Sequence, residues 1–517
     1  MSAHFKWYPS SEEVVVPWNA RYSYPSQANK AIKITPRIPP KNGSSFTPGS
    51  IIRLEFPAQG YVNPINTTLE FDVTMTATAA AGYARFQNNI QSIFTRVRLM
   101  YGSTPLEDII NYNQIVRNLT EWTASGAQNT IDQVSISEGV GNVTQGQNCA
   151  NAAVALDPTA GLTVGLVNVR QKFIQGLDFA GDGTNTLGCR EVPNSVSADG
   201  ATVTAYNCTR RYQVNLALGL LTQSKLIPTK FMASQLAIEI TLDSAADCIF
   251  STLSTANYSV QNVNLIPEIL EFDSSYDAMF LKGLQDGGVP IKFASWHTFL
   301  FGTGGASALN LQIQERSRSV KALFACMQLS TPVLTLDTGA TLFNSNAAGS
   351  MINYQYRIGG RYFPGQPVEL SINGGAICNG GAEAYVELQK AMNVVGDYRL
   401  STGCNTIRWA HSGFGIATDF QTNLVGFSTL NVPVVSSALA ETLTLGGNLG
   451  SQCYTSSIDL ETSNGVEISG LNAEEQSDIA FIARWTNAQS SSYVINVFTY
   501  YDSMLILREN NVMELIQ

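Results

Sequence analysis

Charged side chains are scarce in this sequence. Asp, Glu, Lys and Arg make up 14% of its 517 residues, against about 25% in an average soluble domain. The 40 acidic residues outnumber the 30 basic ones, which gives a net charge of -10. Phosphate groups are bound by clustered positive charge, so direct sequence-specific binding of nucleic acid is not expected. Asn, Thr, Ser, Gly and Gln take the place of the missing charges, which suits a polar surface largely covered by other subunits.

Long apolar runs are also missing. The sequence has no stretch of 18 consecutive apolar residues, so no membrane-spanning helix is expected. Its first residues, MSAHFKWYPS, lack an apolar core behind a basic patch, so secretion through a signal peptide is not expected either.

Sequence motifs of catalysis and cofactor binding are absent. The three histidines, His4, His297 and His411, lie far apart, and the sequence contains no HExxH, no GxSxG and no Gly-Lys dipeptide. A zinc protease helix, a hydrolase nucleophile elbow and a standard phosphate loop are therefore excluded. Asp178 and Asp182 fit turn chemistry better than a calcium loop, and His297 fits a core or interface position. We predict no enzymatic activity, no catalytic residues, no cofactor and no metal site.

The eight cysteines are widely spaced, and none forms a CxxC pair. Structural zinc needs closely paired ligands, so the spacing favours free, mostly buried thiols, although the even number leaves disulfides open. These residues are Cys149, Cys189, Cys208, Cys248, Cys326, Cys378, Cys404 and Cys453.

Alternation of apolar and polar residues dominates the rest of the chain. In Thr68–Ala77, for example, Leu69, Phe71, Val73 and Met75 alternate with polar residues, which is typical of strands with one buried face. Further strands are expected at Ser50–Phe56, Phe94–Tyr101, Tyr212–Gly219, Gln235–Leu242, Val263–Phe272, Lys292–Phe301, Val320–Met327, Tyr354–Ile358, Asp478–Trp485 and Tyr493–Leu507. Helical spacing is local, in three stripes: Ile109, Tyr112, Val116 and Leu119; Tyr276, Phe280 and Leu284; and Tyr385, Leu388 and Met392.

This pattern predicts an all-β fold of two β-sandwiches. We expect the first over residues 46–272 and the second over 289–510, joined by a linker helix at 273–288 and followed by a tail at 511–517. A long insertion rich in small polar residues, at about 123–208, is expected to form an exposed tower on the outer surface. In Tyr354–Pro367 we expect Tyr354, Tyr356 and Ile358 to face a core, with Pro364 and Pro367 ending the strand pairing.

The first 45 residues predict an extended arm, because prolines are too frequent there for a helix or a central strand. Residues 14–41 contain five basic residues and no acidic one. On an acidic chain this contrast predicts an arm that binds an acidic protein surface, a neighbouring subunit or a minor structural protein, with a solvated leader as the alternative. The candidate partner-binding residues are Arg21, Lys30, Lys33, Arg37 and Lys41.

Several segments, in this order, resemble the major capsid protein of polinton-like viruses and virophages. They are FQNNIQSIFTRVRLMYGS at Phe86–Ser103 followed by Pro105-Leu106-Glu107, KLIPTKFMASQL at Lys225–Leu236, Tyr276-Asp277 with Phe280–Leu284, GVPIKFASWHT at Gly288–Thr298, YQYRIGGRYFPGQP at Tyr354–Pro367 and EAYVELQKA at Glu383–Ala391. The resemblance covers about residues 60–510, and the segments 123–208 and 329–350 have no counterpart in it.

The resemblance implies two tandem eight-stranded jelly rolls with long loop insertions and a few short helices. It also implies a homotrimer shaped like a pseudo-hexamer and an icosahedral shell of such trimers in a virion capsid, assembled inside the host cell. Penton and minor capsid proteins, and a host receptor contacted by outer loops, are the further partners it implies. The alternative is a jelly-roll viral surface protein that binds a receptor or a carbohydrate, since lectins share this sandwich.

Overall fold

The structure is a computed structural model of the chain. It describes residues 31–77, 84–86, 90–123, 206–251, 257–329, 351–370, 382–394, 455–461, 469–474, 478–485, 488, 493–508 and 513–517. The segment 124–205, which holds nearly all of the predicted tower as well as Asp178 and Asp182, lies outside these residues, as do His4, His411, Arg21 and Lys30.

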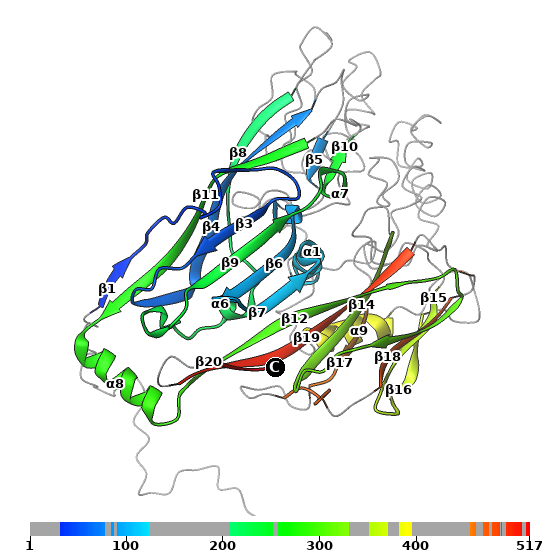
Figure 1. Ribbon diagram of the computed structural model, residues 1–517. Helices are drawn as coiled ribbons and strands as arrows, with labels where there is room; N and C mark the ends of the chain where they lie inside the picture. The colour runs from blue at the N-terminus through cyan, green and yellow to red at the C-terminus, as the bar shows by residue number, and fades with distance from the viewer. Residues whose placement is uncertain are drawn as a thin grey trace, which may run out of the picture.

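The first half of the chain builds two antiparallel sheets that pack face to face (Figure 1). One sheet has the order β3-β9-β6-β7, formed by Ile51–Glu55, Leu236–Leu242, Phe94–Tyr101 and Thr104–Ile110. The other has the order β1-β11-β4-β8, formed by Ala31–Ile34, Asn257–Phe272, Tyr61–Ala77 and Tyr206–Val214, and β2 (Ser45–Phe46) also pairs with β11. A small pair joins β5 (Ala84–Phe86) to β10 (Ile249–Ser251).

The second half repeats this layered plan. One sheet has the order β12-β19-β14-β17, formed by Val289–Gly302, Tyr493–Leu507, Val320–Leu329 and Ser456–Asp459, with β20 (Met513–Ile516) also paired to β19. The facing sheet has the order β13-β18-β15-β16, formed by Ala308–Ile313, Ile479–Trp485, Met351–Ile358 and Arg361–Glu369. The predicted all-β fold of two sandwiches is confirmed, while the count of eight strands in each stays a prediction.

The alternation read from the sequence sorts side chains between core and surface. Along β4, Leu69, Phe71, Val73 and Met75 are each at most 3% exposed and belong to the core between the sheets of the first sandwich. The intervening positions lie on the opposite face of the strand, where Asp72 pairs with Arg211 of β8. A separate core fills the second sandwich, so each pair of sheets is held together mainly by apolar burial.

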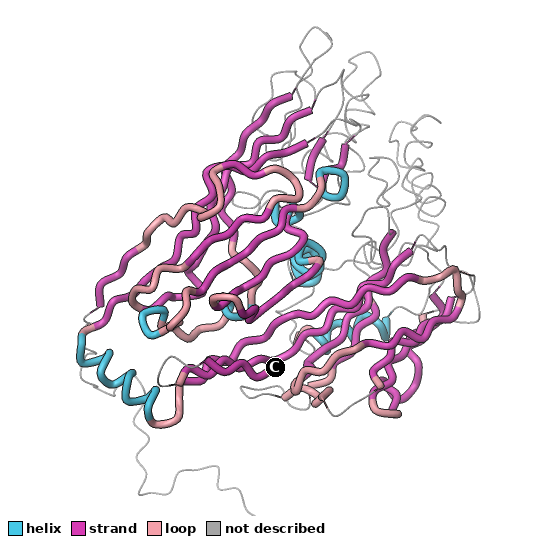
Figure 2. Tube along the Cα trace, viewed as in Figure 1, coloured by secondary structure: helices cyan, strands magenta, loops and turns pink. Residues whose placement is uncertain are grey.

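Helices are few (Figure 2). The three predicted helical stripes form α1 (Tyr112–Thr123), α8 (Ser274–Gln285) and α9 (Ala382–Ala391). Short turns form α6 (Gly219–Thr222), α7 (Ala245–Cys248), η2 (Ile90–Ile93) and η4 (Thr229–Phe231). Helix α8 lies between the last long strand of the first sandwich and β12. It begins where the Asp273 side chain accepts a hydrogen bond from the Ser274 amide, and Gly287 and Gly288 follow it with φ of 142° and 95°, as at many helix ends.

Three local predictions need correction. The strand expected at Tyr212–Gly219 ends at Val214, because the chain turns there to begin α6. Ile109 belongs to strand β7 rather than to helix α1. Pro364 and Pro367 do not end the strand pairing, because both lie inside β16, within the irregularity between the pairs Tyr356–Phe363 and Tyr354–Val368. Strand β16 is at the edge of its sheet, where proline is tolerated.

The predicted core side of β15 is confirmed. Tyr354, Tyr356 and Ile358 are 1%, 0% and 3% exposed, and the turn after them is formed by two glycines of positive φ. The hydroxyl of Tyr356 donates a hydrogen bond of 2.6 Å to the Ser456 carbonyl oxygen.

We expect Tyr356→Ala to lower the free energy of unfolding by about 3–5 kcal/mol, because it leaves a cavity in the core of the second sandwich. Tyr356→Phe keeps the ring and should cost only about 0.5–1.5 kcal/mol for the lost hydrogen bond. Tyr362→Ala is the control, since Tyr362 lies in the same hairpin but is 48% exposed. Denaturant unfolding of the three variants checks this order, and a Tyr356→Ala variant as stable as Tyr362→Ala would contradict it.

Candidate functional site

The described basic residues of the predicted arm form ion pairs within their own chain. The pairs are Lys33 with Glu268, Arg37 with Glu70 at 3.1 Å, and Lys41 with Glu55 at 3.7 Å. Residues 31–34 form strand β1, which pairs with β11, and Ile38 forms a bridge to Leu265. This part of the arm therefore lies along its own sandwich, which the sequence did not predict.

These ion pairs order the arm more than they stabilise it. The three basic side chains remain 59–61% exposed, and exposed ion pairs contribute little to stability. Burial alone would raise the pKa of Glu268, but hydrogen bonds from Lys33, Asn63 and Asn66 hold that pKa below its ordinary value. The partner-binding role predicted for the five basic residues stays a prediction.

A buried carboxylate joins the two sandwiches. Glu107 of β7 is 1% exposed. One of its oxygens accepts hydrogen bonds of 2.7 Å from the Gly219 amide and from the Ser295 hydroxyl of β12, and the other accepts 2.8 Å from the Leu220 amide. Burial raises the pKa of Glu107, and these three hydrogen bonds oppose the rise.

Gly219 is needed at this junction because the two sandwiches approach so closely there. A Cβ added to it would lie 2.0 Å from the carbonyl oxygen of Ala294 in β12. Glycine is the only residue that allows such an approach without a shift of the backbone.

Side-chain amides complete the contact between the sandwiches. Asn111 donates to Asn496 of β19 at 3.2 Å, and Asn496 donates to Gln114 at 2.9 Å. The Thr298 hydroxyl donates to the carbonyl oxygen of Ile110 at 2.7 Å. Side chains at 0% to 8% exposure here are polar but hydrogen-bonded, as buried polar groups must be.

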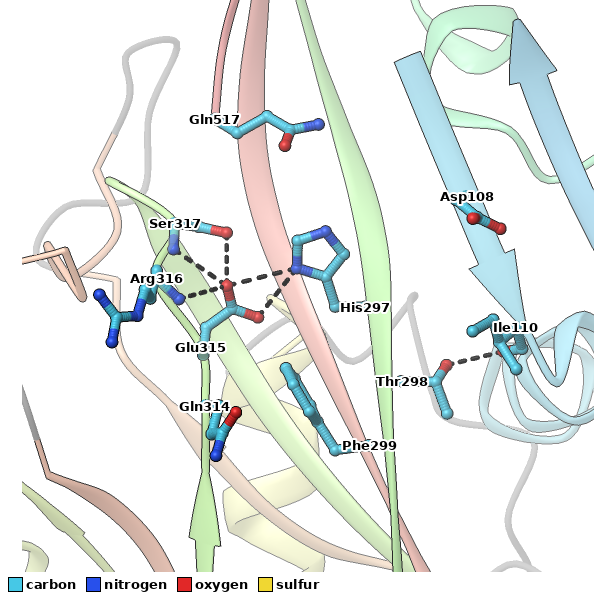
Figure 3. Close-up of a pocket in the computed structure, with 10 residues that line it drawn as sticks. All are labelled: Asp108, Ile110, His297, Thr298, Phe299, Gln314, Glu315, Arg316, Ser317 and Gln517. Atoms are coloured by element: carbon cyan, nitrogen blue, oxygen red, sulfur yellow. Dashed lines mark hydrogen bonds and ion pairs between the residues drawn. The ribbon is translucent and has the colours of Figure 1, made fainter. Parts of the chain in front are cut away.

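A pocket of about 470 Å³ opens beside this junction (Figure 3). Asp108 and Ile110 come from β7 of the first sandwich, and the other lining residues come from the second. His297 and Glu315 point toward each other in it (Figure 3). The lining residues are Asp108, Ile110, His297, Thr298, Phe299, Gln314, Glu315, Arg316, Ser317 and Gln517.

The His297–Glu315 pair holds β12 to the segment after β13. Nδ1 of His297 lies 3.1 Å from Oε2 of Glu315, whose side chain is 1% exposed. The other oxygen accepts from the Arg316 and Ser317 amides at 2.9 Å and from the Ser317 hydroxyl at 2.6 Å. Burial would raise the pKa of Glu315, but the contacts with His297 and Ser317 bring it below its ordinary value.

This arrangement differs from that of a nucleophilic catalyst. In a serine triad the imidazole lies between the hydroxyl and the carboxylate and takes the hydroxyl proton. Here the carboxylate lies between, and it bonds both His297 and Ser317. The interface position predicted for His297 agrees with this geometry.

Metal and membrane features are also lacking in the part of the chain that the structure describes. No group of three His, Cys, Asp or Glu side chains there could hold a metal ion, and no helix there is long and apolar enough to cross a membrane. Cys248 and Cys326 are free and buried, as predicted. The side chains of the other six cysteines lie outside the description.

Sequence reasoning missed Glu107, Gly219 and Glu315 as residues of the junction. Glu107 follows Leu106 in a short strand in which both side chains are buried, and alternation alone assigns one of the two to solvent. Gly219 carried no signal, because the contact that requires glycine comes from a strand 75 residues further along the chain.

Comparison with known proteins yields likeness in structure but not in sequence. A scan against protein-family models and a search of curated proteins found no match. The Faustovirus major capsid protein superposes with a TM-score of 0.52 at 9% identity, over 95% of this chain and 93% of that chain. The VP54 protein of PBCV-1, in a crystal structure fitted into a reconstruction of the virophage Sputnik, gives 0.50 at 8% identity, over 96% and 99%. The chain thus has the double jelly-roll fold of these proteins.

We expect Gly219→Ala to disrupt the junction, because the added methyl group would overlap the Ala294 carbonyl oxygen. The loss in free energy of unfolding should reach about 3 kcal/mol or more. Gly302→Ala is the matched control, since a Cβ there meets no atom within 4 Å.

If Gly219→Ala fails to fold, Ser295→Ala tests the same junction more gently. It removes one of the three donors to Glu107 and should cost about 1–3 kcal/mol. Thermal unfolding measures both variants, and equal stability of Gly219→Ala and Gly302→Ala would show that the sandwiches approach less closely than described.

Glu315 should make stability depend on pH in the acid range. Its folded-state pKa lies below its ordinary value, so its contribution is present above the unfolded-state pKa and is lost as pH falls through the folded-state pKa. Glu315→Gln should cost about 1–3 kcal/mol at neutral pH and should flatten the loss of stability below pH 4.5. Urea unfolding at several pH values checks this, with the 52%-exposed Glu474 changed to Gln as control. An unchanged acid limb in Glu315→Gln would contradict it.

Proposed function

We propose that this protein is a major capsid protein, which forms trimeric pseudo-hexameric capsomers that tile an icosahedral viral shell. The observation that carries the proposal is the pair of like sandwiches fixed side by side, with a superposition on the Faustovirus protein that covers 95% of the chain. Three chains with two sandwiches each present six similar blocks around one axis. A unit with six similar sides can pack against six neighbours in a shell.

The composition supports large contacts between subunits. With 14% charged residues, wide areas of surface can meet without the desolvation of many ions. Obligate interfaces are also larger and more apolar than transient ones. Within this proposal the protein resides in the virion capsid and assembles inside the host cell. Its partners are further copies of itself, penton proteins and minor capsid proteins, and outer loops would contact a host receptor.

The proposal describes a structural protein rather than an enzyme. The alternative, a surface protein that binds a receptor or a carbohydrate, needs only one jelly roll with a binding site at its loops. It does not account for a second sandwich locked to the first by buried contacts. The likeness over both sandwiches therefore favours the capsid function.

We expect the purified protein to be an obligate trimer of about 167 kDa, three times the 55.8 kDa of one chain. Multi-angle light scattering at micromolar concentration measures the mass, and negative-stain electron microscopy should show hexagonal particles or shells. A stable, folded monomer of about 56 kDa would contradict the trimer, and trimers without a hexagonal outline would contradict the capsomer.

A further inference from the structure

Helix α8 presents apolar side chains to solvent. Met279 is 65% exposed and Leu281 is 46% exposed. The opposite side of the helix is fully used, because Tyr276 and Phe280 pack edge-on against Tyr61, with ring centroids 5.4 Å and 5.5 Å apart. The helix lies at an outer corner of the first sandwich (Figure 1). Exposed apolar side chains beside each other on such a helix indicate a contact surface.

The N-terminal segment enters the described structure beside this helix. Ala31, the first described residue, pairs with Phe272 at the end of β11, and α8 begins two residues later at Ser274. Residues 14–30 therefore leave the sandwich at the start of α8. Seventeen residues can span up to about 55–60 Å, whereas the twelve residues of α8 extend over about 18 Å.

The chemistry of residues 14–30 complements that of α8. The segment VVVPWNARYSYPSQANK contains apolar residues, with Val14–Val16, Trp18, Tyr22 and Tyr24 as the largest, and two basic residues but no acidic one. Helix α8 and its ends contain Asp273, Asp277 and Asp286 against a single Lys282. Lys230 already pairs with Asp277, while Asp286 forms no ion pair among the described residues.

We propose that residues 14–30 dock on the outer face of α8 of their own chain, covering Met279 and Leu281. Arg21 or Lys30 then lies near Asp286. The segment docks within its own chain because a short tether raises its effective concentration at α8 to the millimolar range. This assigns an occupant to an exposed surface and goes beyond the proposed function, on which it does not depend.

Limited trypsin digestion of the intact protein tests the contact, because Arg21 is a cleavage site inside the docked segment. Met279→Glu should raise the rate of cleavage after Arg21 about tenfold, equivalent to about 1.4 kcal/mol of lost docking. Leu300→Glu is the matched control, since Leu300 is 60% exposed and lies far along β12 from α8. Equal cleavage rates in Met279→Glu, Leu300→Glu and the unchanged protein would overturn the proposal.

A photoreactive benzoylphenylalanine at position 279 identifies the occupant. In the full-length chain, mass spectrometry should find crosslinks to residues 14–30. In a second sample, a chain that lacks residues 1–30 and carries the probe is co-expressed with an unprobed full-length chain. The proposal predicts no crosslink between these two chains, and a crosslink to the other chain's residues 14–30, or to another surface of a second copy, would overturn it. The same probe at position 300 should capture residues 14–30 in neither sample.

Discussion

The buried carboxylate of Glu107 determines how the two sandwiches meet. It accepts hydrogen bonds from two amides of α6 and from a hydroxyl of β12, so it joins both sandwiches in one small cluster. A carboxylate removed from water needs all of these partners. Any rotation between the sandwiches would break at least the bond to Ser295 and leave charge or dipoles unsatisfied. The close approach of Gly219 to Ala294 fixes the distance at the same place.

Apolar packing reinforces this junction. Phe293, Trp296 and Phe324 of the second sandwich belong to the same buried cluster as the core of the first. The two halves therefore share a core across their boundary, and interiors of this density resist deformation. A chain built in this way behaves as one rigid block with two similar faces, which is what a repeating shell requires of its unit.

The sequence predicted most elements of the fold but little of the junction. Strands such as β4 and β9 and helices such as α8 follow from local periodicity, because one face of each element meets a core. Leu216 and Leu218 misled the strand prediction after Val214, since they are buried in a turn rather than in a strand. The contacts of Glu107, Gly219 and Glu315 depend on residues far away in the sequence. The burial of Lys33, Arg37 and Lys41 partners was likewise invisible, because the acidic residues they meet lie on other strands.

Neutral amides and hydroxyls form most polar contacts of the junction, so salt and pH act on it mainly through a few buried carboxyls. Burial raises the pKa of Asp243, beside α7, to about 6, and it also raises the pKa of Glu107. The stability that a raised carboxyl contributes is present below its unfolded-state pKa and decreases as pH rises through the folded-state pKa. Glu315 acts in the opposite direction, because its pKa is lowered. These opposed carboxyls place the greatest stability in the mildly acidic range, between the loss caused by protonating Glu315 and the cost of ionising Asp243 and Glu107.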